Sequence, residues 1–523
     1  MTPGHSSVDY VEGDPHYPTI VEALDAAADL QPDRTALICE DRHLTFAEYR
    51  RAVAGMAHRL AERHAPGERI ALVMGNGIET AVALMGAYAA RLQTAPLNPA
   101  YTDRELDRLL ADVAPVAVAC SPALAGRVRA LAAGAGGPDI LTVGEGGFDI
   151  RQWAADDRLS LPGQRPRPED RATMFFTGGT TGLPKGAEHI HSSFDWFCRQ
   201  IHAVWRFDFD RETILNVAPM FHIWGHHFSI VFPLYVRATM VIVPQYRPDF
   251  VIGELERNRV SVFAGGPAAI FLGLLGAEAM ADADLGALRH SLAGGSPCPA
   301  DLLARWKART GHDMLEGLGM SEGAPIANNP TGGPTKPLSV GVAPPDTGIE
   351  IVDLETGTRV LPAGERGEIR VRGPQFTIGY RNRPEETAEA IRDGWLYTGD
   401  VGYLDEDGYL FLVDRKKELI LVGGYNVYPR EVDEAMTNHP AVAEAAAVGM
   451  PDDFLGEAVC VFVAFRPGAS ASVEALHRHA EANLAKYKRP KIIRILEALP
   501  KKGPGKIDKL GLKAMAAEGA DRP

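Results

Sequence analysis

The chain has 523 residues, of which 46% are hydrophobic and 23% are charged, and its formal net charge is −14. This length exceeds what one hydrophobic core organises, so two or more domains are expected, and the composition excludes a disordered chain. The charge is spread along the sequence without long blocks of one sign. That distribution argues against nucleic acid as the main partner, because a phosphate backbone recruits clustered Lys and Arg.

The cysteines and the first residues of the chain bear on its compartment. The five cysteines lie far apart and form no CxxC pattern, which is typical of reduced thiols and argues against a zinc ribbon or a disulfide framework. The N-terminal stretch MTPGHSSVDYVEGDP lacks the basic start and the apolar stretch of a signal peptide. No uncharged apolar run is long enough to span a bilayer. We therefore expect a cytoplasmic protein without an integral membrane segment, while peripheral contact with a membrane stays open.

Two kinds of pattern alternate in the first half of the chain. From about residue 20 to residue 262, helical patterns such as 80–92 alternate with short β-rich runs such as 69–74 and 239–244. This alternation predicts α/β layers with mainly parallel sheets.

The pattern changes after Gly348, where short strands separated by turns rich in Gly and Asp predict a β-rich subdomain. Further on, a helix, two apolar strands and a basic tail predict a compact α+β domain. We therefore expect an α/β fold with a large N-terminal domain of layered sheets and a β-rich subdomain, residues 1–414, and a small mobile α+β C-terminal domain, residues 415–523.

The stretch FFTGGTTGLPKGAEHIH, residues 175–191, has the composition of a loop that binds phosphate. Small residues let backbone N–H groups converge on one point, and Thr hydroxyls and a Lys ammonium add donors suited to phosphate oxygens. The spacing does not fit the GxxxxGK[ST] pattern, because Lys185 follows Pro184 and precedes Gly186. A switch-type nucleotide hydrolase is therefore not indicated, and by composition alone a plain turn is the alternative.

The residue order TGGTTGLPKG resembles the phosphate-loop signature of the adenylate-forming superfamily, which includes acyl-CoA synthetases, aryl-CoA ligases, luciferases and the adenylation domains of peptide synthetases. Other segments resemble further signatures of this superfamily in the same order. They are PMFHIWG (219–225), AGGSPCP (293–299), EGLGMSEG (316–323), GWLYTGDVGYLDEDGYLFLVDRKKELILVGGYNVYP (394–429) and LPKKGPGKIDK (499–509). The resemblance extends from about residue 20 to residue 513.

The resemblance implies an ATP site. The loop would hold the phosphates, residues 293–299 would lie against adenine, and Asp400 with Arg415 would hold the ribose hydroxyls. Leu318 stands in place of the usual Tyr and would offer adenine an apolar contact. The nucleotide-binding residues implied in this way are Thr177, Gly178, Gly179, Thr180, Thr181, Gly182, Lys185, Gly295, Ser296, Pro297, Glu316, Gly317, Leu318, Ser321, Asp400 and Arg415.

The resemblance also implies residues for catalysis and for coenzyme A. Lys506 would bridge the carboxylate and the phosphate in the transition state, Glu322 would bind Mg²⁺, and Thr177 would contact the phosphates. His222 would gate the acyl pocket. Lys417 falls at the hinge between the domains. Gly423 and Gly424 suit a surface for the pantetheine arm, and for these glycines a plain hairpin turn is the alternative.

Acidic residues are missing from the stretches that line the acyl pocket in the superfamily. There is no Asp or Glu between residues 213 and 248 or between residues 258 and 277. A substrate with a free amino group would need a buried counter-charge there, so an apolar carboxylic acid is expected. The expected acyl contacts are His222, Ile223, Trp224, Gly225, Gly265, Gly266, Gly319 and Met320.

We therefore expect an ATP- and Mg²⁺-dependent acid:CoA ligase that converts a medium- or long-chain fatty acid to acyl-CoA through acyl-AMP and releases AMP and pyrophosphate. The alternatives are an aryl- or alicyclic-acid:CoA ligase, an acyl-AMP ligase that loads a carrier protein, and a nucleotide-binding regulatory module without turnover. The expected partners are the small-molecule acid, ATP and CoA, and a homodimer stays open.

Overall fold

The computed structural model describes residues 8–132, 137–144, 146–177, 184–296, 298–423, 425–452, 455–502 and 506–518. The contacts divide the chain into two compact units, Met1–Ile349 with Val371–Leu396 and Glu350–Arg370 with Tyr397–Pro523. In the described ranges, no helix is both long enough and apolar enough to cross a membrane. All five cysteines are unpaired and buried.

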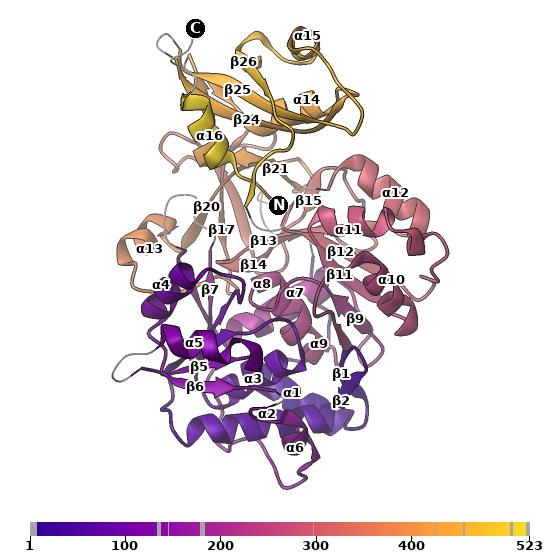
Figure 1. Cartoon of the computed structure of the whole chain (residues 1–523), viewed down its shortest axis with the longest axis vertical. Coiled ribbons are helices and arrows are strands. Elements are labelled where there is room, and N and C mark those ends of the chain that lie inside the picture. The colour runs from indigo at the N-terminus through magenta and orange to yellow at the C-terminus, as the bar shows by residue number, and fades with distance from the viewer. Residues whose placement is uncertain are drawn as a thin grey trace. The chain divides into compact units, whose positions relative to one another are not determined.

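An eight-stranded sheet runs through the first unit (Figure 1). In spatial order its strands are β14 (Gly323–Asn328), β13 (Met314–Met320), β12 (His290–Gly294), β11 (Val262–Gly266), β9 (Thr213–Asn216), β10 (Thr239–Ile242), β1 (Thr35–Cys39) and β2 (Arg42–Thr45). The strands from β13 to β1 are parallel to their neighbours, whereas the edge strands β14 and β2 are antiparallel. This sheet therefore has the mainly parallel character expected from the sequence.

A seven-stranded sheet forms the other layer of the first unit. In spatial order its strands are β18 (Gly379–Tyr380), β8 (Gly186–Ile190), β7 (Arg171–Phe176), β4 (Gln93–Leu97), β3 (Arg69–Val73), β5 (Ala117–Cys120) and β6 (Asp139–Thr142). The strands from β7 to β6 are parallel, and β8 and β18 add an antiparallel edge. The edge strand β18 comes from a part of the chain nearly two hundred residues beyond β8.

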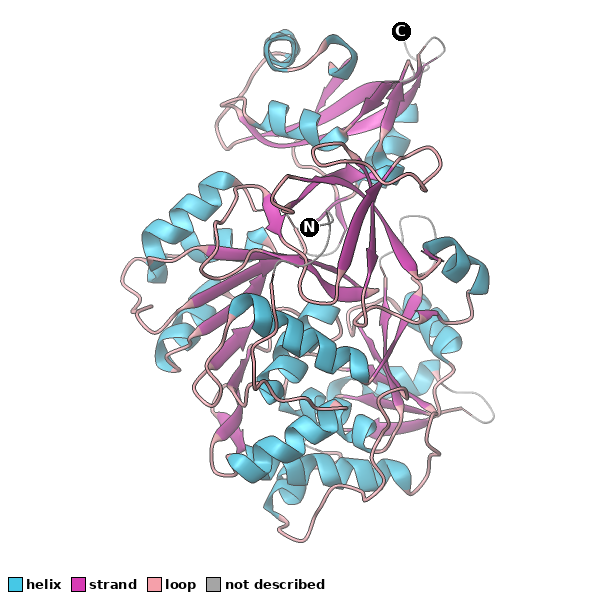
Figure 2. Ribbon diagram, turned by 180° about the vertical axis from the view of Figure 1, so that it is seen from behind, coloured by secondary structure: helices cyan, strands magenta, loops and turns pink. Residues whose placement is uncertain are grey.

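Helices cover both faces of these sheets, as Figure 2 shows by secondary-structure type. Along β3, Ile70 and Leu72 pack in one buried cluster with helices of the central layer, while Ala71 and Val73 pack in another on the opposite face. This period of two is what a strand buried on both faces requires. The helices are α1 (Ile20–Leu30), α2 (Phe46–Ala61), α3 (Ile78–Ala89), α4 (Asp103–Val113), α5 (Ala125–Leu131), α6 (Ile150–Ala155), α7 (Ser192–Trp205), α8 (Ile223–His226), α9 (Phe232–Tyr235), α10 (Pro248–Arg257), α11 (Ala268–Leu275), α12 (Ala300–Thr310) and α13 (Pro384–Ala390), and the short strands β15 (Ser339–Gly341) and β19 (Ile391–Arg392) complete the unit.

The second unit contains two groups of strands. The first is β16 (Gly348–Val352), β17 (Gly367–Arg372), β20 (Trp395–Leu404) and β21 (Leu410–Arg415); the second is β23 (Tyr425–Val427), β22 (Ile420–Val422), β25 (Gly456–Phe465) and β24 (Val442–Asp452), with β26 (Ile492–Ile495) parallel to β25. Helices α14 (Pro429–Thr437) and α15 (Val473–Asn483) cover one face of the second group, and α16 (Lys509–Glu518) covers the other. A small hairpin joins β27 (Lys501–Lys502) to β28 (Lys506–Ile507).

The α/β fold with a smaller C-terminal part is thus confirmed. The contacts group the segments 350–370 and 397–414 with the C-terminal residues, whereas the sequence places its boundary at residue 414. The predicted pivot at Lys417 and the boundary itself stay predictions.

Candidate functional site

The Gly/Thr loop is the connection of a β-hairpin. Strands β7 and β8 pair up to Phe176 opposite Gly186, and the Thr177 N–H donates to the Lys185 carbonyl over 2.9 Å. The stem of the loop is therefore fixed by the edge of the seven-stranded sheet. The predicted loop residues Gly178, Gly179, Thr180, Thr181 and Gly182 lie outside the described residues.

Ser321 and Glu322 form the two-residue turn between β13 and β14, where Met320 pairs with Gly323. Gly323 has φ +152°, and a methyl group there would lie 2.4 Å from Phe376, so the turn needs glycine at this position. Glu322 is buried, and its Oε1 accepts a hydrogen bond of 2.6 Å from the Tyr380 hydroxyl.

Hydrogen bonds hold this turn against β8. The His189 ring donates from Nε2 to the Ser321 carbonyl over 2.8 Å, and the Thr377 N–H donates to the Glu322 carbonyl over 2.7 Å. The Thr377 hydroxyl donates in turn to the carbonyl of Glu188 in β8. Burial lowers the pKa of His189 to about 4, so the ring is neutral at pH 7 and carries its proton on Nε2. The loop stem and the Glu322 turn, predicted separately from the sequence, therefore lie on neighbouring elements.

The residues predicted to face adenine come from two adjacent parallel strands. At their carboxyl ends Gly294 pairs with Gly317, next to Glu316, and Gly295 follows with φ +80°. Two hydrogen bonds fix the segment that follows Gly295. The Ala268 N–H at the start of α11 donates to the Ser296 hydroxyl, and the Cys298 N–H donates to the Glu316 carboxylate. Leu318 is half-buried in β13, and Pro297 lies outside the described residues.

The predicted acyl contacts gather around Trp224 at the start of α8. The Trp224 indole N–H approaches the Ala264 carbonyl at 3.4 Å, and methyl groups on Gly266 or Gly294 would meet this ring. Gly265 points the other way, because a methyl group there would meet Phe263 and Phe271.

The remaining predicted acyl residues lie in α8, directly before α8 and at the end of β13. His222 is exposed and precedes α8, where its Nδ1 accepts from the Trp224 N–H. Ile223 and Gly225 are buried in α8. At the end of β13, Gly319 is exposed and Met320 half-buried.

A buried histidine cluster lies at α8, where His226 and His227 are adjacent in the sequence and the fold adds His191, which no sequence pattern connected with them. His226 shares a hydrogen bond of 2.7 Å with the Tyr88 hydroxyl, and His227 donates from Nδ1 to the Ile223 carbonyl over 2.8 Å. Burial lowers the pKa of His226 to about 3 and that of His191 to about 4, so these rings are neutral aromatic groups. Phe194 packs against all three of His191, His226 and His227. In the described part of the chain, no three His, Cys, Asp or Glu side chains are arranged to hold a metal ion.

Asp400 and Arg415 lie in the second unit. They are cross-strand partners in β20 and β21, with 2.8 Å between Arg415 Nε and Asp400 Oδ1. The Asp400 N–H also donates to the Thr398 hydroxyl. The two residues predicted to hold ribose hydroxyls are thus brought together, Asp400 nearly buried and Arg415 largely exposed.

The other predicted residues of the second unit lie in short turns. Lys417 is exposed in a 3₁₀ turn, η4 (Lys416–Glu418). Gly423 has φ +57° in the hairpin between β22 and β23, and its N–H donates to the Leu455 carbonyl over 2.8 Å. Gly424 lies outside the described residues, and so does the side chain of Lys506, whose backbone pairs with Lys502 in the β27–β28 hairpin.

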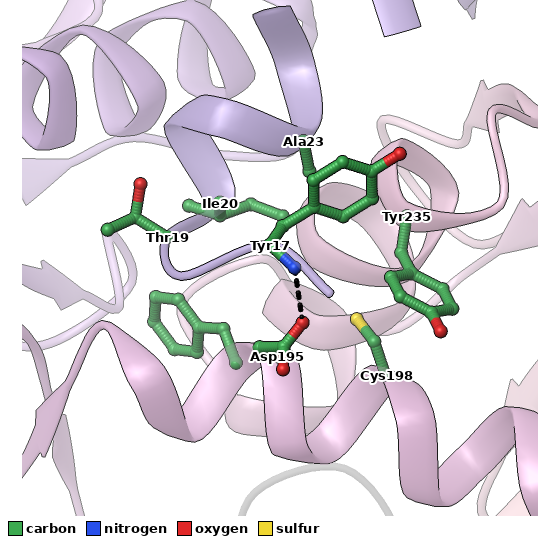
Figure 3. Close-up of a pocket in the computed structure, with 8 residues that line it drawn as sticks. Tyr17, Thr19, Ile20, Ala23, Asp195, Cys198 and Tyr235 are labelled. Carbon is green, nitrogen blue, oxygen red and sulfur yellow. Dashed lines mark hydrogen bonds between the residues drawn. The ribbon is translucent and has the colours of Figure 1, made fainter. Parts of the chain in front are cut away.

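A small pocket lies elsewhere in the first unit, beside Tyr17 and Ile20 near the N-terminus (Figure 3). It is lined mainly by apolar groups of Tyr17, Ile20, Cys198 and Tyr235, and Asp195 beside it accepts the Tyr17 N–H over 2.8 Å. None of the residues predicted for the site lines it, so it belongs to the core and not to the site.

Known proteins resemble this chain over nearly its whole length. Residues 24–381 match the family model of AMP-binding enzymes, and residues 431–506 match that of the AMP-binding enzyme C-terminal domain. A long-chain-fatty-acid–CoA ligase of Bacillus subtilis (strain 168) is 32% identical over 524 residues, which cover 94% of this chain and 93% of the relative. A feruloyl-CoA synthase of Amycolatopsis is 35% identical over 483 residues, covering 92% and 95%. The crystal structure of ATP-bound MatB from Rhodopseudomonas palustris superposes with a TM-score of 0.86 at 30% identity, covering 95% of this chain and 98% of that one.

Proposed function

Because the chain belongs to the AMP-binding enzyme family and is an AMP-forming acid:CoA ligase, we propose that it activates an apolar carboxylic acid, a medium- or long-chain fatty acid. ATP and CoA are the co-substrates that fit this family. The proposal covers the identity of the acid, the roles of the site residues and the use of Mg²⁺.

The observation that carries the choice of acid is the uncharged surrounding of Trp224. Its ring packs against Phe228 with 4.7 Å between centroids and lies over Gly266 and Gly294, and residues 213–248 include no carboxylate. An ammonium group on the acid would lose its hydration here without gaining a counter-charge, at a cost of several kcal/mol. An alkyl chain has no such cost and gains from the removal of apolar surface from water.

In the first half-reaction, a carboxylate oxygen of the acid attacks the α-phosphorus of ATP, and pyrophosphate leaves. Two anions have to meet, so positive charge and fixed donors provide most of the rate enhancement. Thr177 and Lys185 with the loop between them would bind the phosphates, and Ser321 would donate its hydroxyl to the α-phosphate. The Lys506 ammonium would bridge the carboxylate and the phosphate.

Other residues would orient the nucleoside. A methyl group on Gly295 would meet nothing within 4 Å, so the backbone there leaves space for a flat ring, whereas Gly317 is packed against Asn328 and Trp205. In the second unit, the Asp400 carboxylate would accept hydrogen bonds from the ribose hydroxyls. Arg415, which already contacts Asp400, would keep that carboxylate oriented.

The residues present fit a Mg²⁺ ion that is bound together with ATP. Mg²⁺ is commonly held by one or two carboxylates together with substrate phosphates and waters, and Glu322 supplies one buried carboxylate at the loop stem. No donor among the described residues bonds to Glu322 Oε2, the oxygen that Tyr380 leaves open. When bound, the ion would neutralise charge on the phosphates.

In the second half-reaction, the CoA thiol attacks the acyl carbonyl of acyl-AMP and AMP leaves. Lys506 would then occupy space that the pantetheine arm requires. A rotation about the turn that contains Lys417 would remove it, and the hairpin at Gly423 and Gly424 would present a surface without side chains to the arm.

The proposal is tested by a panel of acids that varies chain length and aromaticity, with AMP formation measured with and without CoA. We expect the highest kcat/KM for saturated acids of medium or long chain. Pyrophosphate should be released with acid and ATP alone, and free AMP should form only with CoA. Lys506→Ala is the control, because it should abolish acyl-AMP formation, and wild-type adenylation by this variant would contradict the mechanism.

An aryl acid is the second candidate, and the similarity to feruloyl-CoA synthase together with the aromatic ring of Trp224 favours it. Cinnamic and benzoic acids in the same panel decide between the two. A pantetheinylated carrier protein offered beside CoA tests the remaining alternative, an acyl transfer to protein. A preference for the carrier would overturn free CoA as the acceptor.

A further inference from the structure

We propose that Tyr380 is a positioning residue that holds the Glu322 carboxylate in one orientation and links it to Lys185 at the stem of the Gly/Thr loop. This inference rests on the proposed function, in which Glu322 binds Mg²⁺ and the loop binds the phosphates of ATP. Tyr380 lies outside the signature segments quoted from the sequence, and the pairing of β18 with β8 brings it to the site.

The hydroxyl of Tyr380 makes a strong contact with Glu322. The distance from Oη to Oε1 is 2.6 Å, in the range of a hydrogen bond from a hydroxyl to an ionised carboxylate. An ionised carboxylate has only acceptors, so the phenol hydroxyl is the donor of this bond. The bond therefore gives one oxygen of a buried carboxylate a fixed partner.

The ring of Tyr380 contacts the loop stem at the same time. The Lys185 ammonium lies over the ring, 5.2 Å from its centroid, which is the geometry of a cation–π contact. One side chain thus touches both the residue proposed to bind the metal and a residue proposed to bind phosphate. Its two ends differ chemically, so substitutions can remove them separately.

The backbone fixes the position of this side chain. Tyr380 pairs with Ala187 in β8, its N–H donates to the Thr387 hydroxyl over 2.9 Å, and the next N–H, that of Arg381, donates to the Gly186 carbonyl over 2.9 Å. Tyr380 is therefore held by β8, which begins at Gly186, and by Thr387 of α13.

This arrangement has a consequence for metal binding. With Oε1 held by Tyr380, the carboxylate cannot rotate freely, and Oε2 is presented in one direction. A ligand that is already oriented loses less conformational entropy when the ion binds. Removal of the hydroxyl should therefore weaken the binding of Mg²⁺ with ATP, while the binding of ATP without metal should change little.

Tyr380→Phe tests this point, because it removes the hydroxyl and keeps the ring over Lys185. The measurement is calorimetric titration of the full chain with ATP, once with Mg²⁺ and once with EDTA, in the absence of acid and CoA. The ratio of the two dissociation constants is the gain in affinity due to Mg²⁺. We expect Tyr380→Phe to reduce this gain about tenfold and to change the dissociation constant in EDTA by less than about twofold.

Tyr10→Phe is the matched control. The Tyr10 hydroxyl donates to the Asp346 carboxylate over 3.0 Å, and the Arg199 guanidinium lies over the Tyr10 ring at 4.4 Å. Tyr10→Phe therefore also removes a hydrogen bond from a phenol to a carboxylate and keeps a ring beneath a cation. It does so in the first unit, away from the site residues. It should leave the Mg²⁺ gain unchanged.

A double-variant cycle with Glu322→Gln separates positioning from a general loss of structure. Glu322→Gln should abolish most of the Mg²⁺ gain, and in that background Tyr380→Phe should reduce it by less than about twofold. Independent effects that multiply in the double variant would overturn the proposal, because the two residues would then act separately. A thermal unfolding scan of each variant checks that it is folded.

The outcomes separate this inference from the proposed function. A wild-type Mg²⁺ gain in Tyr380→Phe, or no Mg²⁺ gain in the wild-type protein, overturns the role of Tyr380 whatever the ligase assay shows. A reduced gain in Tyr380→Phe combined with no pyrophosphate release for any acid supports Tyr380 and overturns the proposed substrate class.

Discussion

Gly225 shows how one residue without a side chain controls the path of the chain at the proposed acyl pocket. A methyl group at this position would lie 1.9 Å from the Pro219 carbonyl oxygen, which already accepts the His222 N–H over 3.0 Å. The Asn216 side chain also donates to the Gly225 carbonyl. The close approach of two backbone segments, and not a positive φ, is what requires glycine here.

Gly225→Ala should therefore lower the stability of the first unit by at least about 2 kcal/mol, because overpacking at a fixed backbone contact has no easy relief. Gly253→Ala is the matched control, since Gly253 is exposed in the middle of α10 and a methyl group there meets nothing within 4 Å. That change should raise stability by about 0.5–1 kcal/mol through helix propensity. Urea unfolding of both variants measures the difference, and shifts of the same sign would contradict the argument.

At the residue scale, residues that one local hairpin brings together are the easiest to pair from sequence, while the ribose-binding role of Asp400 and Arg415 stays a prediction. Asp400 and Arg415 flank one turn, so their pairing follows from strand register. Tyr380 could not be predicted, because its position depends on which distant strand pairs with β8, and no local pattern encodes that choice. Gly379 adopts a positive φ of +140°, but a glycine in the sequence does not show which strand its neighbour Tyr380 will pair with.

Among the elements, α16 matters because it directly follows the strand that contains Lys506. Its N-terminus is capped by Asp508, whose Oδ1 accepts the Gly511 N–H over 3.0 Å. The first residue of the helix, Lys509, reaches Asp433 in α14 at 2.9 Å and Glu418 in η4 at 3.6 Å. Lys509 therefore connects the segment proposed for catalysis to the turn proposed as the hinge.

Lys509→Met should weaken this attachment. It leaves Asp433, which is about one-fifth exposed and also accepts the Ala447 N–H, without its ammonium partner, at a cost of about 1–3 kcal/mol. Lys513→Met is the control on the same helix, because the more exposed Lys513–Glu457 pair is worth about 0–1 kcal/mol. Hydrogen–deuterium exchange in peptides from α14 and α16 of the full chain measures local stability. Equal exchange in the two variants would show that the Lys509 contacts do not anchor the helix.

At the element scale, the sequence placed the regular segments closely. The pattern at 80–92 corresponds to α3 and the run at 239–244 to β10. The sequence did not predict the register of the sheets. Parallel strands are joined through helices, so their pairing depends on the packing of the whole layer. This is also why the sequence did not predict the contact between the Glu322 turn and β8.

The first unit as a whole buries several histidines that are neutral in the folded state. The pKa of His189 and of His191 is lowered to about 4, and that of His226 to about 3, with burial as the main cause in each case. In the unfolded chain these imidazoles titrate near 6.5. Below that pH the unfolded state binds more protons, so the stability present above pH 6.5 is lost as the pH falls toward 4.

His191→Phe removes one of these titrating groups. The slope of the free energy of unfolding against pH should therefore fall by about 1.4 kcal/mol per pH unit near pH 5. Phenylalanine fits the aromatic surroundings of Tyr88 and Phe194, and neither His191 ring nitrogen has a hydrogen-bond partner among the described residues. The melting temperature of the variant should therefore rise relative to the wild-type protein as the pH is lowered from 7.5 to 5. A difference that stays constant over this range would mean that His191 does not contribute to the acid sensitivity.

The chain passes between the two compact units three times, after Ile349, after Arg370 and after Leu396. A gene shortened to end at Ile349 would encode the Glu322 turn without Tyr380 and the rest of β18, and the edge of β8 would be left unpaired. A gene shortened to end at Leu396 would retain β18 but would also encode the segment Glu350–Arg370, separated from its partners. An exchange of the second unit between relatives therefore needs three matched junctions, and a single crossover would produce an incomplete unit on both sides of the cut.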